Sequence, residues 1–575
     1  MRRLLIAALF ASASPAIAQQ DPLAQIVMAP IPIVTPAPAP ILAPPRIIPT
    51  NWRQTFDAIR AEDWAGAIAG IETLPDSPLR PVARAELYTA RNSPRVELAP
   101  LLALLAEAPD LPQADQLQKM AIARGAVDLP PSTPTRGLVS LSEAPRRVRA
   151  RPISGEPAAD ALRDQLVPFV DADDGPGAEA LLLTTLPLLS IEARAEASQR
   201  VAWIYYVLGR DADTRRVADQ GRLGAVSEWG AQAAWVGALA AWRMGDCTAS
   251  KAGFGDAMRL GTNAEFTAAA AYWGARSAQA CRRPREVEPL LIIAARSSES
   301  FYGLLARDTL GLGTTLPRPD PSPPAARVAG YNNVRRATAL AAIGERALAE
   351  QMLRYQARIG SPSDQEELIA VARGLDLGGA QYWLAHNGQP GTRVAAADRY
   401  PAPRWVPDHG WRIDPALAFA HVIQESSFRA DAVSPANAIG LMQVRPGAAS
   451  DTARARGDAF TPSLLKRPET NLDHGQAFIE LIRGSSATKG QLPRVIAAYN
   501  AGPVPVERWK YINDRGDPLL WIESIPYWET RYYVPAVMRN MWVYQGLAGA
   551  PQPTLRSLVQ HQWPAFPAPT ANSVR

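Results

Sequence analysis

IDPALAFAHVIQESS, at residues 413–427, is the stretch that decides the fold of the C-terminal part of this chain. Asp414 is a good helix N-cap and Pro415 suits the first helical position, so the apolar run predicts a mostly buried helix. Glu425 then falls in its last turn. Apolar neighbours and the negative end of the helix dipole both raise a carboxyl pKa. We therefore expect Glu425 to stay protonated near neutral pH, as a general acid must.

Three further short motifs follow in the same region. They are GLMQ at 440–443 with Pro446 after it, AAYNAGP at 497–503 and IPYWETRYYV at 525–534. Met442 can form an adaptable apolar floor and Gln443 both donates and accepts hydrogen bonds, a pairing suited to a sugar. Glu529 and Tyr533 are four residues apart and share one helical face. Each motif alone also fits an ordinary helix end.

In this order, the four motifs resemble the catalytic domain of the soluble lytic transglycosylases, which has a goose-lysozyme-like fold. The family pattern is ES, GLMQ-x-x-P, AAYNAG and IP-x-x-ETR-x-YV, and all four occur within residues 396–549. The resemblance implies that Glu425 is the catalytic acid/base. It implies a set of substrate-binding residues: Ser426, Ser434, Met442, Gln443, Tyr499, Asn500, Glu529 and Tyr533. One departure is Phe478, where the family usually has tyrosine.

The resemblance implies a reaction that uses one carboxyl group. Asp414, Asp431 and Asp451 lie outside the motifs, so none is a clear partner for Glu425. In the family, the acid protonates the glycosidic oxygen between N-acetylmuramic acid and N-acetylglucosamine, and the substrate's own C6 hydroxyl attacks. The product is a 1,6-anhydro-muramyl end, formed without metal or cofactor. The substrate's acetamido group would stabilise the oxocarbenium-like intermediate.

Two other functions remain open at this stage. A muramidase-type hydrolase would use the same site with water as the attacking group. A catalytically silent periplasmic scaffold would only bind the glycan, although the intact Glu425 argues against it. The mass of the product distinguishes the transglycosylase from the hydrolase. The activity of a Glu425→Gln variant distinguishes an enzyme from the silent scaffold.

Residues 51–324 show helical periodicity with weak repeats. YVLGRD at 206–211 resembles WRMGDC at 242–247, a step of 36 residues, and the same step leads to Cys281. Helix pairs of this length form α-solenoids, with an irregular bundle as the alternative. FYGLLA at 301–306 resembles a stretch in the superhelical domain of the large family members. The predicted fold is therefore mainly α, with an α-superhelical, solenoid-like domain followed by a lysozyme-like α or α+β catalytic domain.

Proline-rich segments divide the rest of the chain. Residues 325–395, between two proline-rich joints, would form a small helical linker domain. Residues 19–50 form a proline-rich linker, and residues 550–575 a disordered tail.

The N-terminus has the pattern of a secretory signal peptide over residues 1–18, with Ala16-Ile17-Ala18 as the cleavage site. Export to the periplasm is the expected localisation. No later stretch of the sequence is long and apolar enough to span a membrane, and a peripheral association with the envelope stays open. The expected partner is the peptidoglycan glycan strand, and contacts with other cell-wall enzymes stay open.

Composition excludes several other classes of protein. The net charge of +5 over 575 residues is too weak to argue for nucleic-acid binding. Five scattered histidines and no HExxH or CxxC pattern argue against a metal site. The two cysteines, Cys247 and Cys281, lie in neighbouring helical hairpins, which permits a disulfide, and pairing and free thiols stay equally open.

Overall fold

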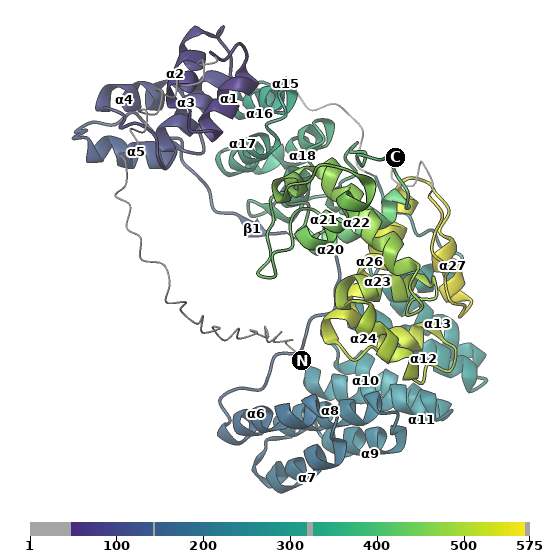
Figure 1. Cartoon of the computed structure of the whole chain (residues 1–575). Helices are drawn as coiled ribbons and strands as arrows, with labels where there is room; N and C mark the ends of the chain where they lie inside the picture. The colour runs from purple at the N-terminus through teal and green to yellow at the C-terminus, as the bar shows by residue number, and fades with distance from the viewer. Residues whose placement is uncertain (1–47, 142–143, 319–325, 570–575) are drawn as a thin grey trace, which may run out of the picture.

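A computed structural model describes residues 48–141, 144–318 and 326–569. The predicted signal peptide, most of the proline-rich linker and residues 319–324 of the first proline-rich joint lie outside these ranges. Within them the fold is helical, and the only strands are β1 (Val139–Ser140) and β2 (Asn387–Gly388), which pair antiparallel. Figure 1 shows the helices along an arc, with α1–α5 at one end and α6–α9 at the other.

Five short helices come first among the described residues, and two of them begin at a side-chain cap. The bounds are α1 Trp52–Arg60, α2 Trp64–Thr73, α3 Leu79–Thr89, α4 Leu98–Glu107 and α5 Ala114–Ala123. Asn51 and Asp63 accept hydrogen bonds from backbone N–H groups at the starts of α1 and α2, both at 3.0 Å. These caps satisfy N–H groups that have no partner inside the helix.

These helices share their hydrophobic core with helices more than 200 residues later in the sequence. The later set is α15 Ala326–Ala329, α16 Asn332–Ala342, α17 Arg346–Ile359, η2 Pro362–Asp364, α18 Gln365–Gly374 and α19 Gly378–His386. Phe56, Leu104 and Met352 belong to this one core. Residues 325–395 are thus not a separate linker domain, and 51–324 are not one continuous body. The two sets of short helices bury their apolar faces together.

The second group of helices forms the expected array. Its members are α6 Pro157–Asp171, α7 Gly175–Thr185, η1 Leu186–Leu188, α8 Ile191–Val207, α9 Asp211–Gly221, α10 Glu228–Arg243, α11 Cys247–Leu260, α12 Ala264–Ala280, α13 Pro284–Ala295 and α14 Phe301–Thr309. The repeat at 36 residues is confirmed as successive hairpins. Gly209 joins α8 to α9 and Gly245 joins α10 to α11, with φ of +73° and +79°. A side chain at either turn would be strained, which explains the glycine.

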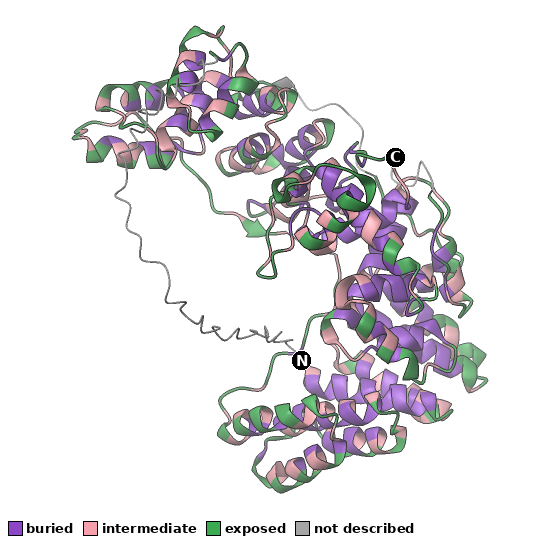
Figure 2. Ribbon diagram, viewed as in Figure 1, coloured by how far each residue is buried: buried purple, intermediate pink, exposed green. Residues whose placement is uncertain are grey.

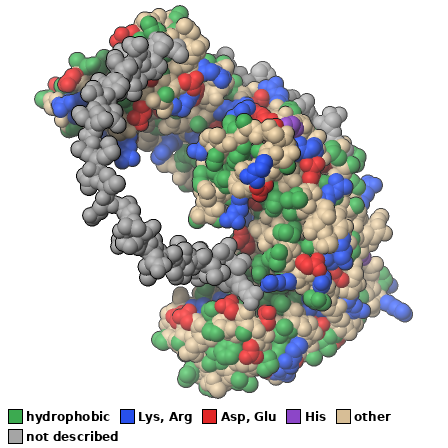
Figure 3. All heavy atoms as spheres, viewed as in Figure 1, with side chains coloured by type: hydrophobic (Ala, Val, Ile, Leu, Met, Phe, Trp, Pro, Cys, Tyr) green, Lys and Arg blue, Asp and Glu red, His purple; other side chains and the backbone are tan. Residues whose placement is uncertain are grey.

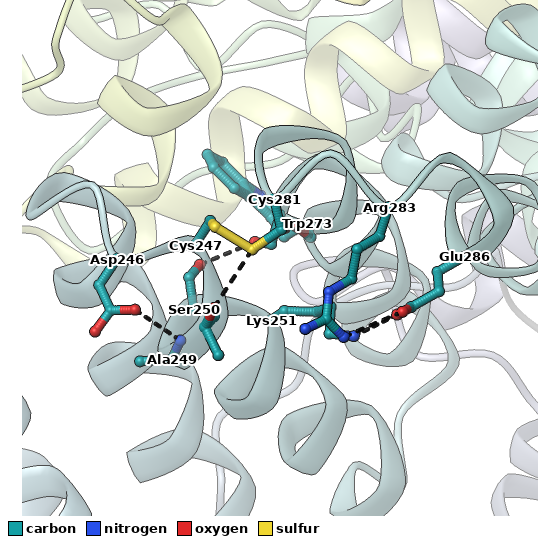
Figure 4. Close-up of a disulfide and its surroundings, with 11 residues drawn as sticks. Asp246, Cys247, Ala249, Ser250, Lys251, Trp273, Cys281, Arg283 and Glu286 are labelled. Atoms are coloured by element: carbon teal, nitrogen blue, oxygen red, sulfur yellow. Dashed lines mark hydrogen bonds and ion pairs between the residues drawn. A yellow bond between two sulfur atoms is a disulfide. The ribbon is translucent and has the colours of Figure 1, made fainter.

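Cys247 and Cys281 form a disulfide between neighbouring hairpins of this array (Figure 4). Cys247 begins α11 and Cys281 directly follows α12, with 5.5 Å between their Cα atoms. Close by, the hydroxyls of Ser250 and Ser277 are hydrogen-bonded at 2.9 Å between the same two helices. The covalent link therefore reinforces a contact that packing already makes.

The C-terminal part packs around two mostly buried helices, α20 and α26. Its elements are η3 Ala396–Arg399, α20 Pro415–Ser426, α21 Pro446–Arg456, η4 Pro462–Lys466, α22 Pro468–Arg483, α23 Leu492–Ala501, α24 Pro503–Arg508, η5 Trp509–Tyr511, α25 Pro518–Glu523, α26 Trp528–Leu547 and α27 Pro553–Val559. Helices α20 and α26 lie against each other and are buried along most of their length (Figure 2). This part shares one core with the α6–α14 array.

Arginines of the array hold the start and end of α25. The Arg276 guanidinium pairs with Asp517 at 2.6 Å, and Arg243 donates to the Ser524 hydroxyl at 2.8 Å. Arg147 makes two hydrogen bonds of 2.8 Å to the Glu523 carboxylate. Arg147 belongs to the connecting segment that runs from α5 past β1 to α6 (Figure 1). Charged pairs thus fix the array, the connecting segment and the C-terminal part to one another.

The tail is ordered where the structure describes it, which corrects the predicted disorder over 550–569. Leu555 and Leu558 on α27 are fully buried. The backbone N–H of Leu492 donates to the carbonyl of Pro564 at 3.0 Å, and Phe566 is buried. The proline content suggested disorder, but the apolar residues between the prolines pack against the core.

Candidate active site

Glu425 lies where the sequence predicts, in the last turn of a buried helix. Asp414 caps α20 by accepting from the Ala416 N–H at 2.9 Å, and Pro415 occupies the first turn. The helix ends abruptly because Ser427 and Phe428 adopt left-handed conformations, with φ of 52° and 63°. Non-glycine residues rarely take this conformation, and such strain often marks functional sites. The turn leaves Glu425 at the C-terminal end of an apolar helix.

Burial raises the pKa of the Glu425 carboxyl to about 7. The charge of Glu529 raises it further, and a hydrogen bond from the Tyr533 hydroxyl, at 2.5 Å to Oε1, lowers it. The direction agrees with the expectation from the sequence, and desolvation is its main cause. At this pKa the group is present in both its acid and its base form near neutral pH.

Three aromatic side chains form a cluster beside Glu425. The imidazole of His421, one turn earlier on α20, lies 2.8 Å from the Tyr533 hydroxyl through Nδ1. The ring centroids of His421 and Tyr499 are 4.5 Å apart. Burial lowers the pKa of His421 to about 3, so its ring is neutral at physiological pH. Tyr533 and Tyr499 have pKa values well above the ordinary range, again because of burial, so both keep their hydroxyl protons.

A tight loop carries the GLMQ motif. Gly440 has φ of +79°, and a Cβ there would lie 2.2 Å from the Leu465 carbonyl oxygen. Asn471 holds the loop, because its amide donates to the Ile439 and Leu465 carbonyls at 2.8 Å and accepts from the Met442 N–H at 2.7 Å. No motif pointed to Asn471. A buried asparagine in a helix next to a glycine-containing loop is the signal that could have found it.

The AAYNAG motif ends α23 beside this loop. The Tyr499 hydroxyl donates to the Met442 carbonyl at 2.7 Å, which joins two motifs directly. Thr530 donates to the side-chain oxygen of Asn500 at 2.6 Å, and the Asn500 amide lies 3.5 Å from Glu529. These bonds tie α23 to the start of α26. The site is therefore assembled from all four motifs.

Most of the predicted site residues come together, but Ser426 faces away from the others. Its hydroxyl is buried and donates to the Val422 carbonyl of its own helix at 3.3 Å. Met442 is also fully buried, and its backbone rather than its side chain meets Tyr499. Gln443 and Ser434 are half-buried in the loop, with Gln443 donating to the Gly440 carbonyl at 2.9 Å.

A cavity of about 1290 Å³ lies beside the site, between the array and the C-terminal part. Gln424, Asn500, Glu529 and Tyr533 line one end of it; Glu425 itself is outside the lining. Seven arginines and three carboxylate residues line the cavity, although several of these arginines are paired with glutamates behind the wall. Trp203 of α8 contributes an aromatic wall and stacks on the Arg531 guanidinium at 3.7 Å.

On the face seen in Figure 3, basic and acidic side chains are interspersed. Within the described ranges, no three histidine, cysteine or acidic side chains are grouped to hold a metal. Nor does any helix of those ranges have the length and apolar content to cross a bilayer.

Residues 407–522 match the family model described as "Transglycosylase SLT domain". These residues form a transglycosylase SLT domain. The match includes Glu425 and the GLMQ and AAYNAG motifs, so the resemblance stated from the sequence is confirmed.

Two curated relatives align over the same part of the chain. The soluble lytic murein transglycosylase of Escherichia coli K12 is 34% identical over 155 residues, which is 26% of this chain and 23% of the relative. The membrane-bound lytic murein transglycosylase C of Cronobacter sakazakii is 38% identical over 169 residues, 28% of this chain and 46% of the relative. The aligned part thus spans less than half of either relative.

The whole fold resembles a solved structure. It aligns with the crystal structure of the 70 kDa soluble lytic transglycosylase from Escherichia coli at a TM-score of 0.50 and 17% identity, covering 89% of this chain and 98% of that one. At this identity the match concerns the fold alone. It confirms a mainly α chain in which a superhelical part accompanies the lysozyme-like SLT domain.

Proposed function

We propose that this protein is a peptidoglycan lytic transglycosylase that uses Glu425 as its single acid and base. The observation that carries the proposal is the carboxyl group of Glu425. It is buried enough to hold a proton near pH 7, it lies at the end of a helix beside a cavity, and it belongs to the SLT domain. A general acid works best when its pKa lies near the working pH.

In the first step, protonated Glu425 gives its proton to the glycosidic oxygen between N-acetylmuramic acid and N-acetylglucosamine. The bond from that oxygen to the muramyl C1 breaks, and the 2-acetamido oxygen stabilises the positive charge at C1. Because Oε1 already accepts from Tyr533, the proton to be transferred resides on Oε2.

In the second step, the Glu425 carboxylate takes the proton of the muramyl C6 hydroxyl as its oxygen attacks C1. This closes the 1,6-anhydro ring and returns the acid to its starting form. An attacking group within the same sugar has a high effective concentration. Glu529, the carboxylate that acts on Glu425, raises the Glu425 pKa and so favours its acid form.

The remaining motif residues are assigned to the glycan groove. Ser434, Gln443 and Asn500 carry polar groups on half-buried side chains, which suits hydrogen bonds to hydroxyl and acetamido groups. Tyr499 and Tyr533 hold the loop and the acid in place, and Met442 is part of the floor. The arginine-rich cavity suits groups of an anionic polymer that flank the cleaved bond. Ser426 is left out because its hydroxyl is bonded within α20.

The location proposed for the enzyme is the periplasm, reached by means of the predicted signal peptide at residues 1–18. The Cys247–Cys281 disulfide supports an oxidising compartment outside the cytosol. Peripheral association with the envelope and contacts with other cell-wall enzymes are compatible with this location and rest on the resemblance alone.

The test is the mass of muropeptides released from purified sacculi. The proposal predicts anhydro products, one water lighter than the products of hydrolysis, and no release by the Glu425→Gln variant. Reducing ends would instead support a muramidase-type hydrolase with the same site. Binding of sacculi without any release by the wild-type protein would support the silent scaffold.

A further inference from the structure

His421 contacts the acid through one intermediary. It lies one turn before Glu425 on α20 and is fully buried. Its Nδ1 is 2.8 Å from the Tyr533 oxygen, which in turn is 2.5 Å from Glu425 Oε1. These three side chains form a continuous hydrogen-bonded chain from the interior of the SLT domain to the acid.

The protons of this chain can be counted. Neutral imidazole has one N–H and tyrosine one O–H, so the Tyr533 hydrogen can point either to Glu425 or to His421. If it points to Glu425, the Tyr533 oxygen must accept from Nδ1–H, because otherwise two lone pairs would face each other at 2.8 Å. If it points to His421, Oε1 loses its donor, and a protonated Oε1 could turn its hydrogen inward to Tyr533.

The other ring nitrogen favours the first arrangement. Nε2 of His421 is buried and has no hydrogen-bond partner among the residues that the structure describes. The second arrangement would place the only N–H of the ring there, as an unsatisfied buried donor. The first leaves an unsatisfied acceptor instead, and unpaired buried acceptors occur more readily than unpaired buried N–H groups.

We propose that His421 is a positioning residue whose Nδ1–H fixes the Tyr533 hydroxyl toward Oε1 of Glu425 and so reserves Oε2 for the proton given to the substrate. This inference rests on the proposed acid/base function of Glu425. His421 neither touches the substrate nor titrates, and it acts through Tyr533 alone.

The groups that act on the Glu425 carboxyl come from three helices. Tyr533 and Glu529 come from α26, Tyr499 from α23, and His421 acts from α20 through Tyr533. The hydrogen bond from Tyr533 lowers the Glu425 pKa and the Glu529 charge raises it. Loss of the His421 donor weakens the first effect and leaves the second, so the Glu425 pKa should rise.

The direct test is the tautomer of His421 in the wild-type protein. Nitrogen-15 NMR of protein labelled at histidine, assigned by comparison with a His421→Asn sample, distinguishes a protonated Nδ1 from a protonated Nε2. We expect the proton on Nδ1 at pH 6–8. A proton on Nε2 would overturn the proposal whether or not the enzyme is active, and would leave the assignment of Glu425 untouched.

A matched pair of variants tests the effect on catalysis. In His421→Asn, the side-chain amide N–H can take the place of Nδ1–H. In His421→Leu, the leucine side chain is close in size to asparagine but has no hydrogen-bond donor. We expect His421→Leu to lose roughly tenfold in kcat, the scale of one oriented hydrogen bond, and the basic limb of its pH–rate profile to move upward. His421→Asn should retain most of the rate and the wild-type limb. Equal losses in both variants with unmoved limbs would contradict the proposal.

A double-variant cycle checks that the effect passes through Tyr533. Once Tyr533→Phe has removed the intermediary, adding His421→Leu should cost little more, because residues in one network are not additive. Full additivity would show that His421 acts in another way. Loss of activity in Glu425→Gln remains the separate test of the proposed function.

Discussion

Glu425, which is half-buried, and Glu523, which is fully buried, are two glutamates of the same C-terminal part with opposite surroundings. Glu523 accepts two hydrogen bonds from Arg147 and one from Tyr302, the latter at 2.7 Å. Among the described residues Glu425 contacts no cation, and the charge that acts on it is a second carboxylate, Glu529. The pairing with Arg147 makes Glu523 a fixed structural contact. Glu425 has no such pairing within the described ranges, so it can hold a proton and donate it.

The difference extends to the partners. Four aromatic rings surround the Arg147 guanidinium. The nearby Glu523 carboxylate raises the pKa of Arg147 above the ordinary arginine value, although burial alone would lower it. This pair fastens the connecting segment to the array and the C-terminal part. Around Glu425, the neutral side chains of His421, Tyr499 and Tyr533 supply no charge.

The largest effect is expected from Glu425→Gln on turnover. The amide cannot transfer a proton, so release of muropeptides should fall by roughly 10²–10⁴-fold or more. Product formation from sacculi at pH 6 measures it. Asp451→Asn is the matched control, because Asp451 is exposed and paired with Arg454 away from the site, and its rate should equal the wild type. A slow Asp451→Asn enzyme with an active Glu425→Gln enzyme would reverse the assignment.

Arg147→Met should cause the largest loss of stability. It leaves Glu523 as an unpaired buried charge, which costs about 3–5 kcal/mol. Urea unfolding at pH 7 measures it. The double variant Arg147→Met/Glu523→Gln should recover part of the loss, since the stranded charge is gone. Arg454→Met, which breaks an exposed pair, should be neutral. Equal losses in the free energy of unfolding for Arg147→Met and Arg454→Met would mean that the Arg147 pair does not stabilise the fold.

Glu425→Gln should make the protein more stable above neutral pH. Below about pH 4.5 the carboxyl is protonated in both the folded and the unfolded chain, and as the pH rises toward 7 the unfolded chain ionises first. The wild type therefore loses stability between about pH 4.5 and 7, and the variant does not. The expected gain at pH 8 is about 1–3 kcal/mol, absent at pH 4. A gain that does not depend on pH would point to packing instead.

The smallest effect is expected from Ser426→Ala. Its hydroxyl is bonded only within α20, so kcat and KM on sacculi should stay within about twofold of the wild type. Gln443→Ala, which alters the half-buried loop that we assign to the groove, should raise KM more than this. A strong effect of Ser426→Ala on KM would return that residue to the substrate-binding set.

The acid and its motifs could be predicted from the sequence because each motif is local. Asp414, Pro415 and the apolar run determine α20 within 15 residues, and the 36-residue step of glycine turns predicted the hairpins. The pairing of α1–α5 with α15–α19 could not be predicted, since it joins apolar faces more than 200 residues apart. His421 and Asn471 escaped because neither residue type is unusual in a helix. Only the fold shows that His421 contacts Tyr533 and that Asn471 contacts the loop with the GLMQ motif.

Burial, with no cation among the described residues to offset it, raises the pKa of Glu425 so that it holds its proton near neutral pH. The most direct measurement is a carbon-13 NMR titration of protein labelled at the glutamate side-chain carboxyl, with Glu425→Gln used to assign the signal. The account predicts a midpoint near pH 7 for Glu425. A midpoint near 4.5, the ordinary value for a glutamate, would contradict it.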